Sequence, residues 1–205
     1  MDLTSEQVHW IGGVAFVTIS LLMLARASGH WRWRWIPWLV PALFVGYGLE
    51  SVADVWIHGD AVPPNYAAET RQHLLQGGSL FVAGVVEALV LSGRLFTPIW
   101  RLAVPVALAV TATVFAAHAQ HGGSADAAAM ALMQVQHRGF AIALFTAAAA
   151  RTAEILMTRS AASRQARGAT SAQDSPATLT SAWLLPMLIF GLLMLTYTEP
   201  AMRHS

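Results

Sequence analysis

The chain has 205 residues, of which 56% are hydrophobic and only 11% are charged, and its mean hydropathy is +0.51. A soluble domain carries about 25% charged residues, so this composition indicates an integral membrane protein of one domain. The formal net charge of +1 argues against nucleic acid as a partner, and the absence of cysteine excludes disulfides and thiolate metal sites.

Six hydrophobic runs are each long enough to cross a bilayer, which takes about 20 apolar residues. They cover residues 8–25, 36–55, 72–93, 97–119, 129–155 and 178–199. The predicted fold is therefore an all-α integral membrane protein, a six-helix transmembrane bundle formed by residues 1–205 as a single domain. The segment 159–177 is rich in Ser, Ala, Gln and Arg, so we expect it to form a flexible inner loop.

The arginines indicate how the bundle is oriented. Segments 26–35, 94–101 and 151–175, which are alternate connections between the runs, hold nine of the twelve basic residues, all arginine. Because basic residues accumulate in cytoplasmic loops, we expect both termini on the outer side, the periplasm of a bacterial inner membrane. The run HWRWRWIPW (30–38) is typical of an interfacial anchor, with lipid recognition as the alternative.

Five histidines lie near predicted helix ends that should meet at the outer face. One follows the second run, one opens the third, two close the fourth and one lies about two turns into the fifth. Histidine near lipid is costly unless it is used, and imidazole is a good ligand for copper, zinc, iron and nickel. The sequence therefore predicts an outer metal site built from His58, His73, His118, His121 and His137. We expect the remaining histidines to be solvated, namely His9, His30 and His204.

Two carboxylates accompany the predicted metal site. Glu50 and Asp54 precede His58 by eight and four residues, so all three share one stripe of a helix. They are candidates for a catalytic role or for orienting a metal ligand. Copper is the preferred metal because the site lacks cysteine, has Met130 and Met133 nearby and faces outward. A copper site there would hold or transfer the metal, or would act as a redox enzyme on a lipid-soluble substrate.

Three other functions remain open at this point. Zinc held by three histidines would activate water and hydrolyse membrane lipids. Alternatively, His73 and His137 would be the axial ligands of haem in a b-type cytochrome. A transporter or scaffold without metal is the last alternative. In every case membrane lipid is a partner, and the sequence is compatible with a homo-oligomer.

Two further acidic residues lie deep in predicted spans. Glu87 is 14 residues past His73 and Glu154 is 17 residues past His137, which places them about 21 and about 25 Å farther along ideal helices. They are too distant to bind the outer metal. We expect either a proton or ion path or a structural ion pair near the inner face, with Arg94, Arg101 or Arg151 as the basic partner.

The segments RQHLLQGGSLFVAGVVEAL (71–89) and FAAHAQHGGSADAAAMALMQVQHRGFAIALFTAAAARTAEIL (115–156) resemble the transmembrane protein 45 family. Members of that family are multi-span proteins in which a histidine opens one helix and an acidic residue follows later in it. Farther along the chain, these proteins have a close histidine pair followed by Gly, then a further histidine and finally a second acidic residue. The matching positions in this chain are His73, Glu87, His118, His121, Gly122, His137 and Glu154. The resemblance implies a membrane bundle with this constellation and implies no particular reaction.

Overall fold

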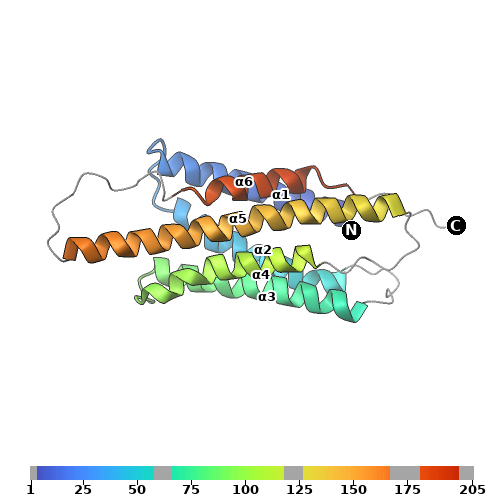
Figure 1. Cartoon of the computed structure of the whole chain (residues 1–205), viewed down its shortest axis with the longest axis horizontal. Helices are drawn as coiled ribbons and strands as arrows, with labels where there is room; N and C mark the ends of the chain where they lie inside the picture. The colour runs from blue at the N-terminus through green and yellow to red at the C-terminus, as the bar shows by residue number, and fades with distance from the viewer. Residues whose placement is uncertain (1–3, 58–65, 118–126, 167–180, 199–205) are drawn as a thin grey trace.

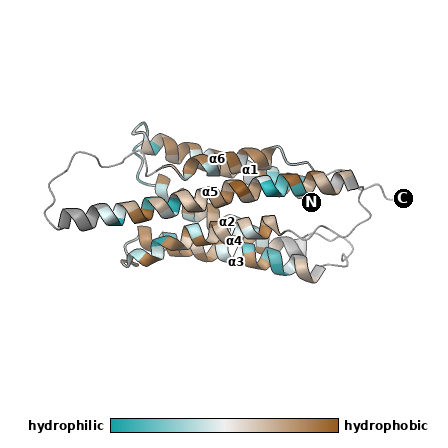
Figure 2. Ribbon diagram, in the orientation of Figure 1, coloured by the Kyte–Doolittle hydropathy of each residue, from teal (hydrophilic) through white to brown (hydrophobic). Residues whose placement is uncertain are grey.

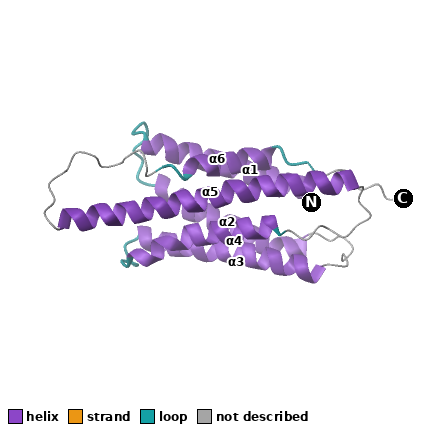
Figure 3. Cartoon of the chain, viewed as in Figure 1, coloured by secondary structure: helices purple, strands orange, loops and turns teal. Residues whose placement is uncertain are grey.

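The structure is a computed structural model of the chain, and it describes residues 4–57, 66–117, 127–166 and 181–198. Within these ranges the chain is helical and contains no strand (Figure 3). The elements in chain order are α1 (Ser5–Ala27), η1 (Ile36–Trp38), α2 (Leu39–Ile57), α3 (Tyr66–Leu91), η2 (Pro98–Leu102), α4 (Ala103–Ala116), α5 (Ala127–Ala166) and α6 (Leu184–Leu195). The all-helical prediction is confirmed for the part of the chain that the structure describes.

Two of the observed boundaries differ from the prediction. Helix α5 continues to Ala166, so residues 159–166 are helical although the sequence predicted a loop from residue 159. Alanine and arginine, which fill this stretch, are strong helix formers, so it extends the helix. Helix α6 has 12 residues and measures about 18 Å, which is shorter than the hydrocarbon core of a bilayer. The other five predicted spans each contain a helix long and apolar enough to cross a membrane.

Local sequence signals explain where α1 begins and ends. The Thr4 side chain accepts a hydrogen bond from the Gln7 backbone, and the Gln7 side chain accepts one from the Thr4 backbone. This capping box satisfies amide groups that otherwise lack partners in the first turn. At the other end, Gly29 adopts a φ of 81°, which residues with a side chain rarely adopt, and the chain turns back on the helix.

The helices pack side by side as an up-and-down bundle (Figure 1). Helix α3 packs against α2 and α4, and α5 packs against α4 and α6, so consecutive helices are neighbours. Helix α6 also packs along α1, which brings the first and last described helices together within the bundle. Because the helices alternate in direction, the start of α1 lies beside the end of α6, where the Trp10 indole donates to the Tyr197 carbonyl.

Glycines allow the closest helix pairs to approach. A Cβ added at Gly48 of α2 would lie 2.7 Å from the carbonyl oxygen of Gly77 on α3, and one added at Gly191 of α6 would lie 2.9 Å from the Val17 nitrogen on α1. Small residues at such crossings let backbones meet, which is how helices associate where water provides no driving force. Gly77 and Gly84 of α3 also lie where a Cβ would meet α2 at under 3.0 Å, whereas Gly78 faces open space.

Hydrophobic residues predominate along the helices (Figure 2), and many of them are exposed on the outside of the bundle. Val135, Ile142 and Val82 are 64%, 69% and 57% exposed, although all three lie in long apolar helices. In water this distribution would be unfavourable, whereas a lipid environment solvates it. Five of the helices are therefore long and apolar enough to cross a membrane, as the composition predicted. Which end of the bundle faces outward is still a prediction from the arginines.

Candidate functional site

His9, His137 and Tyr197 lie at one end of the bundle, which we call the histidine end. Helices α1 and α5 begin there, and helices α4 and α6 end there. His137 of α5 is only 6% exposed. Its ring stacks on Phe115 of α4 with the centroids 5.6 Å apart. Its Nδ1 lies 2.9 Å from the carbonyl oxygen of Met133, one turn earlier in α5. The imidazole is thus held between two helices in a fixed orientation.

The contact with Met133 determines the tautomer of His137. A backbone carbonyl can only accept a hydrogen bond, so Nδ1 must carry the proton and donate it. In the neutral ring the lone pair is then on Nε2. This arrangement, in which Nδ1–H is fixed by a backbone carbonyl, is the one that orients metal-ligating histidines in proteins.

His9 of α1 lies in the same cluster, so its interpretation as a solvated residue was wrong. Its ring is partly buried. It stacks on Tyr197 at 4.0 Å between centroids and lies edge-on to His137 at 6.4 Å. Tyr197 is 2% exposed, and the sequence analysis did not single it out. The contact between His9 and Tyr197 forms because α6 packs along α1. The only signal in the sequence was that His9 and His137 were expected at a similar depth.

The other predicted metal ligands are placed only in part. His73 is partly buried on α3, where the preceding Gln72 donates from Nε2 to the carbonyl oxygen of Ala117 at the end of α4. Glu50 is partly buried on α2, and Asp54 lies in the last turns of that helix. His58, His118 and His121 lie outside the described residues. Within the described ranges no three His, Cys, Asp or Glu side chains lie close enough to hold one metal ion.

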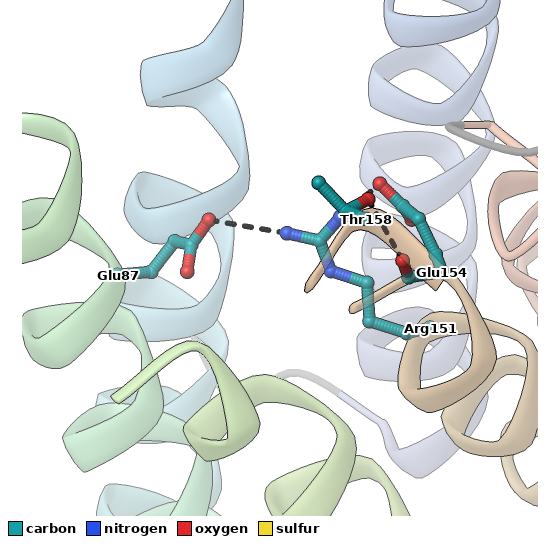
Figure 4. A network of polar contacts seen from close by, with 4 residues as sticks. All are labelled: Glu87, Arg151, Glu154 and Thr158. Atoms are coloured by element: carbon teal, nitrogen blue, oxygen red, sulfur yellow. Dashed lines mark hydrogen bonds and ion pairs between the residues drawn. The ribbon is translucent and has the colours of Figure 1, made fainter. Parts of the chain in front are cut away.

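A second polar cluster is drawn in Figure 4. It lies toward the opposite end of the bundle, because Arg151 follows His137 by 14 residues along α5. Arg151 of α5 lies between the carboxylates of Glu154 and Glu87, and we call these three residues the charged triad. Nη1 of Arg151 lies 2.9 Å from Glu154 Oε1, and its Nη2 lies 3.6 Å from Glu87 Oε1 on α3. The guanidinium also lies 5.1 Å from the centroid of the Trp183 ring. Arg151 is one of the three arginines expected as the partner of these acids.

The charged triad is shielded from solvent by protein. The side chains of Glu87, Arg151 and Glu154 are 10%, 16% and 11% exposed. Oε2 of each carboxylate is buried and has no hydrogen-bond partner in the described part of the chain. Buried charges are tolerated when they are paired, so the Arg151 guanidinium stabilises both acids.

Along α5, apolar side chains separate the two polar clusters. Phe140, Leu144 and Ala147 follow His137 along the inner face of α5, and each is at most 1% exposed. His137 and Arg151 are 14 residues apart, which corresponds to about 21 Å along the helix. These side chains cannot carry a proton. A path through Glu87 and Glu154 thus remains a prediction, and the triad itself is an ion-pair cluster that joins α3 to α5.

Comparisons with known proteins add no further constraint. No protein-family model matches the chain, and neither a curated protein nor a solved structure matches it. The resemblance to the transmembrane protein 45 family over residues 71–156 accordingly stays a prediction.

Proposed function

We propose that this chain is a membrane-embedded metalloprotein that binds a transition metal, preferably copper, at its histidine end, with His137 as a central ligand. The observation that carries the proposal is the orientation of His137. Its Nδ1–H is held by the Met133 carbonyl, which leaves Nε2 as the nitrogen that can bind a metal. A histidine that is 6% exposed inside an apolar helix bundle is also costly unless it has a function.

His9 is the second imidazole of the described residues in this cluster, 6.4 Å from His137 between ring centroids. Further ligands would come from His118 and His121, which follow α4 in the sequence and lie outside the described residues. Helix α4 contacts His137 through Phe115. His73 of α3 and His58 complete the candidate set, with Glu50 and Asp54 of α2 as the nearest carboxylates in the sequence.

The donor types favour copper over zinc. The chain has no cysteine, and the buried Met133 lies one turn before His137. Imidazole with a nearby thioether is a donor set suited to copper, whereas zinc sites more often combine imidazole with thiolate or carboxylate. We place this site on the periplasmic side of a bacterial inner membrane from the arginine distribution. Copper there would supply redox chemistry toward a lipid-soluble substrate or would be stored and passed on.

Elemental analysis with an absorption spectrum tests the proposal on full-length protein purified without a histidine tag. We expect about one copper per chain after reconstitution with copper. The His137→Gln variant should lose most of the metal, whereas His30→Gln, which alters an exposed histidine near the opposite end of α1, should keep it. Equal metal content in both variants, or no metal in the parent protein, contradicts the assignment. One zinc per chain would favour the hydrolase, and a Soret band would favour haem.

A further inference from the structure

The segment that follows α1 forms a pocket that the proposed metal site does not involve. The turn at Gly29 places Trp31 and Arg32 near the last turns of α1, and Leu184 lines the pocket from the start of α6. The pocket measures about 460 Å³ and is lined by Met23, Arg26, Ala27, Gly29, Trp31, Arg32 and Leu184. It combines two guanidinium groups with apolar side chains, and none of the described residues that line it is acidic.

The backbone of this segment is held in place by defined contacts. Nη1 of Arg26 donates to the carbonyl oxygen of Trp33 at 2.9 Å, which folds the loop over the helix end. Trp31, Trp33 and Trp35 form a stacked row with centroids 5.2 and 5.5 Å apart. These rings are 42–53% exposed. Exposed indoles at the end of an apolar helix mark the level of the lipid headgroups.

We propose that this pocket binds an anionic phospholipid, such as phosphatidylglycerol, by its phosphate and part of an acyl chain. Arginine is suited to phosphate because its planar guanidinium donates two parallel hydrogen bonds. The methionine and leucine side chains of the floor provide the apolar contact that a lipid chain needs and a free phosphate does not. Two positive charges, with no acid among the described lining residues, favour an anionic headgroup over a zwitterionic one.

The experiment compares two arginines of the same loop. Arg32 lines the pocket, whereas Arg34 is exposed two residues later and does not line it. Full-length protein in detergent is titrated with phosphatidylglycerol or phosphatidylcholine, and bound lipid is measured by native mass spectrometry. The parent protein should prefer phosphatidylglycerol. Arg32→Gln should weaken that binding about tenfold, which corresponds to the loss of one charge-assisted hydrogen bond, and Arg34→Gln should change it less than about twofold.

Each alternative result overturns the proposal. Equal weakening by Arg32→Gln and Arg34→Gln would mean that lipid responds to total charge and not to the pocket. No effect of Arg32→Gln in a variant with unchanged helical content would remove the pocket as a lipid site. Displacement of phosphatidylglycerol by millimolar inorganic phosphate would identify a free-anion site instead.

Discussion

Replacement of Arg151 by methionine tests whether the charged triad stabilises the bundle. Methionine fills a similar volume, so the change removes the charge and leaves little empty space. Glu87 and Glu154 then remain buried without the guanidinium that lies 3.6 and 2.9 Å from them. Removing one member of a buried ion cluster costs about 3–5 kcal/mol, because the remaining charges lose their partner. We expect a loss of this size in the free energy of unfolding.

Reversible unfolding in mixed micelles, followed by far-ultraviolet circular dichroism, measures this loss. Arg138→Met is the matched control, because Arg138 is an exposed arginine of the same helix. An exposed substitution of this kind should change stability by less than about 0.5 kcal/mol. Adding Glu87→Gln to Arg151→Met should restore part of the loss, since it removes one uncompensated carboxylate. The reasoning is refuted if Arg151→Met costs no more than Arg138→Met, or if Glu87→Gln destabilises the double variant further.

Two packing predictions concern stability alone and use the same unfolding assay. Gly48→Ala places a Cβ 2.7 Å from the Gly77 carbonyl oxygen and should destabilise the bundle by about 1–3 kcal/mol through overpacking. Gly46→Ala is the control, because nothing lies within 4 Å of a Cβ added there. It should be neutral or should stabilise the bundle by about 0.5–1 kcal/mol. Equal losses of stability in both variants would contradict close packing of α2 on α3. Trp10→Phe removes the hydrogen bond to the Tyr197 carbonyl and should lower the free energy of unfolding by about 0.5–1.5 kcal/mol. An unchanged free energy of unfolding would mean that this bond does not hold the start of α1 to the segment after α6.

Hydrophobic runs were sufficient to predict the helices, because apolar length is the dominant signal in membrane proteins. The boundaries were less accurate where the signal is weak. Residues 159–166 contain no large apolar side chain and were predicted to be a loop, yet they extend α5 as helix. A helix that leaves the bilayer no longer needs apolar residues, so hydropathy cannot mark its end.

The candidate sites were predicted to different degrees. The pairing of Glu87 and Glu154 with Arg151 followed from depth and charge, since a buried acid needs a basic partner at the same level. The contact of His9 with Tyr197 did not follow, because it depends on how α6 packs along α1. The position of a residue along its helix predicts its depth in the bundle. Which residues of equal depth are in contact depends on how the helices are arranged around the bundle.

The most direct test of the account is the X-ray absorption spectrum of the copper-loaded, tag-free protein. Imidazole ligands give a distinct multiple-scattering signal, so the spectrum reports both the presence of the site and its histidines. The account predicts two or more imidazoles per copper in the parent protein and at least one fewer in His137→Gln. A bound copper without imidazole scattering, or a spectrum unchanged by His137→Gln, would contradict a metal centre built on His137.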